Sequence, residues 1–169
     1  GVSFYKQGDY SAALARFRKA ADKGQRDAQY NLGYMYRNGN GVEADSTEAA
    51  KWFRLAAKQG SPSAQVMLGE LCVLGEGVED KYWQDPVEAT KWYRAAAEQG
   101  DGEGCFYLGM MFHFGSGVEM DDNEAILWLR KAVESGYEEA EKHLNEILAE
   151  QAQAKVAERA AEKAAQGGG

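Results

Sequence analysis

A stretch of 33 residues from Ala28 to Gly60 returns twice along the chain, first from Ala64 and then from Gly104. Each copy carries, in the same order, a Leu-Gly pair, a Gly-x-Gly-Val turn, an Ala, a Trp, an Arg and a closing Gly. The three copies start 36 and 40 residues apart, which is a period typical of stacked repeat arrays. The sequence therefore predicts a solenoid, in which each repeat packs mainly against its neighbours.

Each copy has the pattern of two helices joined by a glycine turn, which we call helix A and helix B. In the first copy, apolar residues at helical spacing run from Ala28 to Tyr36, and the glycine-rich stretch 38–41 then breaks the helix. Asp45 or Ser46 is expected to cap helix B. The pattern predicts an all-α fold built from helix-turn-helix units.

The expected organisation is a single solenoid domain over residues 1–166, with 167–169 as a flexible end. Its parts are a half repeat at 1–24, a repeat at 28–60, a repeat with an enlarged loop at 64–100, a repeat at 104–136, and a capping helix with a solvated tail at 138–166. The last segment mixes alanine with Glu, Lys and Arg, which are strong helix formers. A polar end face of this kind keeps a repeat stack soluble.

Two recurring residues are expected to have structural roles. The glycine of the Leu-Gly pair would let the two helices of a hairpin cross at close range, at Gly33, Gly69 and Gly109. The tryptophan of helix B would fill the gap between adjacent hairpins, at Trp52, Trp92 and Trp128. We therefore predict that these residues form the framework and do not bind ligands.

Composition limits the classes of partner. The chain has 19 Lys and Arg against 27 Asp and Glu, a net charge of −8, whereas nucleic-acid backbones are bound by clustered cationic residues. No apolar run approaches the roughly 20 residues that span a bilayer. We therefore expect neither nucleic-acid binding nor membrane insertion.

The cysteines leave the cellular compartment open. Cys72 and Cys105 occupy non-equivalent positions in neighbouring repeats, so that one bridge between them or two buried thiols both fit the pattern. A bacterial periplasmic or exported location and a cytoplasmic one both agree with the sequence.

No residues combine a nucleophile, a base and an orienting group. Ser3-x-x-Lys6 matches the serine-nucleophile motif of penicillin-interacting enzymes, but neither of its companion motifs follows. His113 and His143 have no partnered cysteine for a metal site, and the acidic cluster 121–124 lacks the spacing of a calcium loop. We predict a non-enzymatic protein with no catalytic, cofactor or metal site.

The three in-phase copies resemble the Sel1-like repeat family, a relative of the tetratricopeptide repeats. In the first copy the matching residues are Ala28, Leu32, Gly33, Tyr36, Gly39, Gly41, Val42, Asp45, Ala49, Trp52, Arg54, Ala56, Ala57 and Gly60. The resemblance covers roughly residues 9–148, with mild departures such as Cys72 and Phe112 in place of a tyrosine. It implies a right-handed α/α superhelix that serves as a protein-interaction scaffold. In bacteria such proteins act as adaptors, secretion or envelope factors and host-interaction factors.

In an array of this type, helix A lines the concave face and helix B the convex face. Helix A positions that alternate with the core are expected to face a groove, and they are Tyr5, Tyr30, Tyr34, Arg37, Val66, Glu70, Val73, Phe106, Met110, His113 and Phe114. Most of these are aromatic or aliphatic, and several are of types enriched at interfaces. Our hypothesis is that they bind an extended or helical segment of a partner protein. The alternative is that superhelical curvature buries much of the stripe.

The enlarged loop of the second repeat is a second candidate surface, because it carries Tyr82 and Trp83. An inserted loop on one repeat often carries specificity. The alternative is that Trp83 folds onto the edge of its hairpin.

The resulting functional hypothesis is an adaptor or scaffold that binds a partner polypeptide. An inhibitor or immunity-type protein that neutralises a toxin or an enzyme is the main alternative. An enzyme and a helical-repeat RNA binder are two further classes, and the charge argues against the second.

Overall fold

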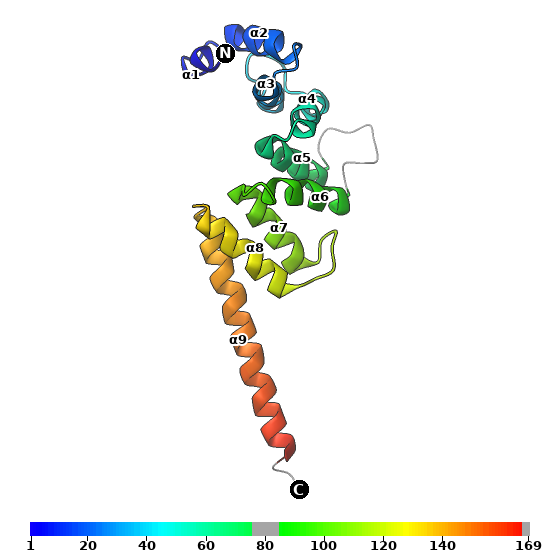
Figure 1. Ribbon diagram of the computed structural model, residues 1–169, viewed down its shortest axis with the longest axis vertical. Coiled ribbons are helices and arrows are strands. Elements are labelled where there is room, and N and C mark those ends of the chain that lie inside the picture. Colours follow the sequence, from blue (N-terminus) through cyan, green and yellow to red (C-terminus); the bar gives the residue numbers. More distant parts are fainter. Residues whose placement is uncertain (76–84, 167–169) are drawn as a thin grey trace.

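The computed structural model describes residues 1–75 and 85–166. Within these residues the chain forms nine helices and no strand, so the all-α solenoid expected from the repeats is confirmed (Figure 1). The helices are α1 (Val2–Lys6), α2 (Tyr10–Ala21), α3 (Arg26–Asn38), α4 (Ser46–Lys58), α5 (Pro62–Leu74), α6 (Pro86–Ala97), α7 (Gly102–Phe114), α8 (Asp122–Glu134) and α9 (Glu139–Gln166). Figure 1 shows α1 to α8 stacked one after another, with α9 leading away from the stack.

The sequence marks the helix ends with aspartate and glycine. Each B helix begins at an aspartate whose carboxylate accepts a backbone N–H of the first turn: Asp9, Asp45, Asp85 and Asp121. Asp45, and not Ser46, therefore caps α4. Each of the helices α3, α5 and α7 ends at a glycine in the left-handed region: Gly39, Gly75 and Gly115. Satisfied N-termini and glycine C-termini explain why these short helices stop where they do.

The two helices of each hairpin cross at the predicted glycines. A Cβ atom on Gly69 would lie 2.4 Å from the Tyr93 ring, and one on Gly33 would lie 2.8 Å from the Phe53 ring. In the third hairpin, Gly109 faces a leucine in the same way, at 2.9 Å. The close crossing is therefore confirmed, since any side chain at these glycines would overlap helix B.

The residue that fills the crossing follows the tryptophan by one position. Phe53 is fully buried and Tyr93 is 2% exposed. By contrast, Trp52 and Trp92 are only partly buried against the core, and Trp128 alone of the three is buried. The sequence-based prediction therefore assigned too much of the packing to the tryptophans at the first two crossings.

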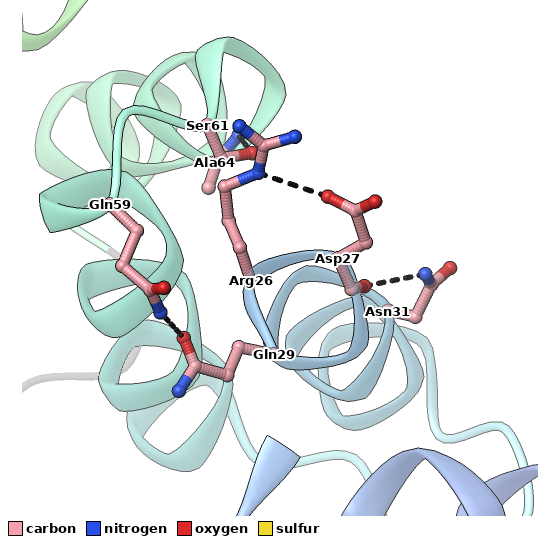
Figure 2. A network of polar contacts seen from close by, with 7 residues as sticks. All are labelled: Arg26, Asp27, Gln29, Asn31, Gln59, Ser61 and Ala64. Carbon is pink, nitrogen blue, oxygen red and sulfur yellow. Dashed lines mark hydrogen bonds and ion pairs between the residues drawn. The ribbon is translucent and has the colours of Figure 1, made fainter. Parts of the chain in front are cut away.

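Buried glutamines join each repeat to the preceding one. The Gln29 Nε2 atom donates to the carbonyl oxygen of Ala21 at 3.3 Å, and the Gln29 Oε1 atom accepts from Gln59 Nε2 at 2.7 Å (Figure 2). Gln65 makes the equivalent two bonds one repeat later, at 3.3 and 2.8 Å. Because a buried amide left without partners is unfavourable by about 1–3 kcal/mol, these bonds help to fix the register of successive hairpins.

Both cysteines are buried free thiols, which decides between the two possibilities left open by the sequence. Burial raises the pKa of Cys72 to about 11, so the thiol stays protonated at neutral pH.

The end of the array is formed by α9, which packs on α8 through Ala140 and Ile147. Beyond this contact the helix is exposed from residue 152 to 163. None of the helices in the described part of the chain combines the length and the apolar character that a membrane span requires.

Candidate functional site

Helices α3, α5 and α7 form a row along the array. Helices α5 and α7 contact each other although α6 lies between them in the sequence. In each of these helices, two equivalent positions that lie three residues apart are at least partly accessible, and they are Asn31 and Tyr34, Met67 and Glu70, and Tyr107 and Met110. We call these six residues the A-helix face.

A pocket lined by tyrosines lies at the N-terminal end of the A-helix face. It has a volume of about 380 Å³ and is lined by Tyr5, Tyr30, Asn31 and Tyr34. The ring centroids of Tyr5 and Tyr34 are 6.4 Å apart, and those of Tyr30 and Tyr34 are 6.5 Å apart. The Tyr5 hydroxyl accepts a hydrogen bond from Asn40 Nδ2 at 2.7 Å, which holds its ring at the edge of the pocket. Three of the residues predicted from the sequence are therefore brought together here.

Glu70 links all three helices of the row. Its Oε2 atom accepts from Arg37 Nη1 on α3 at 2.7 Å, and its Oε1 atom accepts from the Tyr107 hydroxyl on α7 at 3.2 Å. Arg37 also contacts the Met67 sulfur at 2.9 Å. Both oxygens of Glu70 are thus bonded, and the Arg37 charge is neutralised within the face.

Glu103 is the second carboxylate of this region, and it is half-buried. It lies in the first turn of α7, where the helix dipole favours a negative charge. Burial first, and then the charges of Glu70 and Asp101, nevertheless raise the pKa of Glu103, while Arg37 lowers it. Within residues 1–75 and 85–166, the Glu103 carboxylate forms no hydrogen bond and no ion pair.

The raised pKa of Glu103 predicts how stability depends on pH. The ordinary pKa of a glutamate is 4.5. Because the pKa of Glu103 is higher than this in the folded state, the folded protein loses stability as the pH rises from about 4.5 through the folded pKa. We expect Glu103→Gln to raise the melting temperature at neutral pH and to have a much smaller effect at a pH of about 4, where the carboxyl is mostly protonated in both states. Thermal melts of the variant and wild type at both pH values test this. An equal shift at both would contradict it.

Two predicted groove residues do not face solvent. Val66 is 0% exposed and Phe106 is 6% exposed, so the expectation that they line an open groove is wrong for these positions. Each lies three residues before a crossing glycine and therefore shares the side of helix A that packs on helix B. Phe106 instead supports neighbouring rings, 5.1 Å from Tyr137 and 5.4 Å from His143.

Three further predicted residues lie near the C-terminal ends of α5 and α7. Val73 and Phe114 are exposed, at 53% and 69%. His113 contacts Asp122 at 2.7 Å through Nδ1. Tyr82 and Trp83 lie outside the described residues.

Sequence reasoning missed several residues that line the face. Asn31, Met67 and Tyr107 each directly follow the position that was expected to be exposed, and Glu103 lies one turn before Tyr107. The spacing from the crossing glycine would have revealed them, since Asn31 and Tyr34 share a helix face that Gly33 does not.

A second pocket lies at the turn between the first two repeats, with a volume of about 480 Å³. It is lined by Gln25, Arg26, Asp27, Ala28 and Gln59. Figure 2 shows Arg26, Asp27 and Gln59 as sticks. The only ion pair among these residues, at 3.0 Å, joins two exposed neighbours on α3. In the described part of the chain, no group of three His, Cys, Asp or Glu residues is placed to hold a metal ion.

Comparison with known proteins identifies the repeat. The family model described as Sel1 repeat matches residues 2–25, 26–61, 62–101 and 102–137. A solved Sel1 repeat protein from Oxalobacter formigenes is 36% identical, with a TM-score of 0.74 over 85% of this chain and 59% of that protein. Helicobacter pylori cysteine rich protein B is 22% identical, with a TM-score of 0.60 over 78% of this chain and 92% of that protein, a likeness that shows the fold alone.

Curated relatives match over a shorter stretch. The DAP3-binding cell death enhancer 1 proteins of Rattus norvegicus and Mus musculus are 45% identical to this chain over 49 residues. This match takes in 29% of the chain and 10% of each relative. The chain therefore spans about a tenth of the length of the curated relatives that it matches.

Proposed function

The chain belongs to the Sel1 repeat family, and from this premise we propose that it is an adaptor that binds a segment of a partner polypeptide on the A-helix face. Sel1 repeat proteins are generally non-catalytic protein-interaction scaffolds. The mammalian relatives are likewise named for binding another protein.

The tyrosine pocket is the observation that carries the proposal. Tyr34 is 39% exposed, and the rings of Tyr5 and Tyr30 stand beside it in an open hollow. Tyrosine provides a large contact area at a low entropic cost and is enriched among residues that dominate binding energy. A polypeptide side chain inserted between these rings would bury apolar area that water now covers.

The main alternative from the sequence was an inhibitor or immunity-type protein. Neither the site nor the relatives support it. A scaffold that holds a linear segment requires only the open row of A helices described above.

The proposal is tested by selecting binders from a displayed library of random linear peptides of about 12 residues, which reach up to about 40 Å when extended. We expect selected peptides to bind the wild type and to lose affinity by about tenfold with Tyr34→Ala, equivalent to about 1.4 kcal/mol. Titration calorimetry with the selected peptides measures the difference.

The matched control is Leu127→Ala on α8, which removes a similarly exposed apolar side chain, 46% accessible, from a B helix. It should leave peptide affinity within about twofold of the wild type, because surface substitutions away from a contact have small effects. Failure to select any peptide, or an equal loss with both variants, would rule out binding on the A-helix face.

A further inference from the structure

The charged groups at the A-helix face differ in whether they form an ion pair. Arg37 is held by Glu70, with side chains that are 23% and 18% exposed. Among the residues that the structure describes, Glu103 forms no ion pair, although the Arg37 charge still lowers its pKa from farther away. Next to the A-helix face the protein therefore leaves one half-buried carboxylate that no side chain pairs with directly.

Two tyrosines lie near Glu103 in the fold. Tyr107 lies four residues after Glu103 on α7, and so on the same side of the helix. Its ring stacks on that of Tyr93, with centroids 4.9 Å apart. Tyr137 packs against the residue before Glu103, since a Cβ atom on Gly102 would lie 3.2 Å from the Tyr137 Cβ. Burial, and then the charges of Glu103 and Glu139, raise the pKa of Tyr137 to about 12.

A carboxylate beside aromatic faces is an environment that favours an organic cation. The carboxylate supplies the opposite charge, and the negative faces of the rings attract a guanidinium or ammonium group further. Half-burial strengthens the attraction, since the effective dielectric constant is lower than in water.

We propose that the segment bound on the A-helix face carries a lysine or an arginine, and that Glu103 pairs with this cation beside the rings of Tyr107 and Tyr137. The inference rests on the proposed function, since it specifies the chemistry of the segment that the adaptor binds. The net charge of −8 over the whole chain adds long-range attraction for a basic partner.

Other cationic or anionic ligands fit less well. A metal ion shared between the two carboxylates would have to displace existing bonds, because both oxygens of Glu70 already accept hydrogen bonds. A nucleic-acid phosphate would be repelled by Glu103 and Glu70.

The test uses the peptides selected for the wild type. Their sequences should be enriched in Lys or Arg at one position, and replacing that residue with the neutral analogue norleucine should weaken binding at least tenfold. Glu103→Gln should weaken the parent peptide at least tenfold and the norleucine peptide by less than about threefold, because the pair is already broken.

The control variant is Glu119→Gln, which removes the same charge from an exposed position beyond the other end of α7, a helix about 20 Å long. It should change peptide affinity by less than about twofold, since screening weakens charges beyond about 10 Å. Circular dichroism at neutral pH verifies that both variants keep the helical content of the wild type.

The outcomes separate the two proposals. Peptides that bind, depend on Tyr34 and show no preference for a basic residue would overturn the inference about the cation and leave the adaptor function standing. Unchanged affinity for Glu103→Gln would do the same. Peptides that bind independently of Tyr34, or no binding at all, would overturn both.

Discussion

Gly117→Ala should unfold the third repeat more readily than any other single methyl addition in the turns. Gly117 has a φ of +72°, and a Cβ atom there would lie 2.1 Å from the carbonyl oxygen of Pro86 and 2.7 Å from the Val87 nitrogen. The clash is with backbone at the start of α6, which cannot rotate away as a side chain can. The left-handed conformation adds about 1–2 kcal/mol and overpacking about 1–3 kcal/mol.

The reason for this contact is the way successive hairpins stack. The turns after α3 and α7 rest on the first residues of the preceding B helix, and the second glycine of the Gly-x-Gly pair makes the approach. Thr90 fixes the same junction, because its hydroxyl donates to the Ser116 carbonyl at 3.2 Å. In the first repeat, Gly41 approaches the backbone of Tyr10 in the same way, at 2.8 Å.

The matched control is Gly100→Ala, which has a φ of +80° but no atom within 4 Å of the added Cβ. This variant measures only the free-energy cost of the left-handed backbone conformation, without a clash. The predicted order, from most to least destabilising, is therefore Gly117→Ala, Gly41→Ala and Gly100→Ala. Thermal melts should place Gly117→Ala about 10 °C below the wild type. Equal melting temperatures for Gly117→Ala and Gly100→Ala would show that the turn does not pack as described.

Much of the fold could be predicted because each repeat carries its own local signals. Asp45 and Asp121 act on backbone N–H groups two or three residues away, and the glycines at the helix ends act through their own φ angle. These effects need no information from distant parts of the chain. Repetition of the signals in three copies then indicated the stacking.

The candidate site was harder to predict because it depends on helix rotation. Consecutive residues on a helix are 100° apart, so a shift of one position exchanged the buried Val66 for the accessible Met67. The bonds from Glu70 to Arg37 and Tyr107 connect residues more than 30 positions apart. These side chains meet only because neighbouring A helices pack close together, and no local sequence pattern specifies that packing.

Phe53→Ala should have the largest effect among side-chain truncations in the first hairpin. The Phe53 ring is 0% exposed, fills the crossing at Gly33, and lies 5.8 Å from the ring of Tyr30 in the tyrosine pocket. Removal of a buried phenylalanine destabilises a core by about 3–5 kcal/mol. Because repeats depend mainly on their neighbours, hydrogen exchange should increase in α3 and α4 before it increases in α7 and α8.

Two comparisons make this prediction specific. Leu55→Ala changes a residue of the same helix that is 45% exposed, and it should reduce stability by less than about 1 kcal/mol. Gly33→Ala would clash with the Phe53 ring in the wild type, and should be less harmful in a Phe53→Ala background, where that ring is gone. Additive effects of the two substitutions would mean that the crossing is not held by this contact. Non-additive effects of the two substitutions would show that Gly33 and Phe53 depend on each other across the hairpin. The position of the Tyr30 ring, which forms a wall of the pocket, would then depend on the same contact.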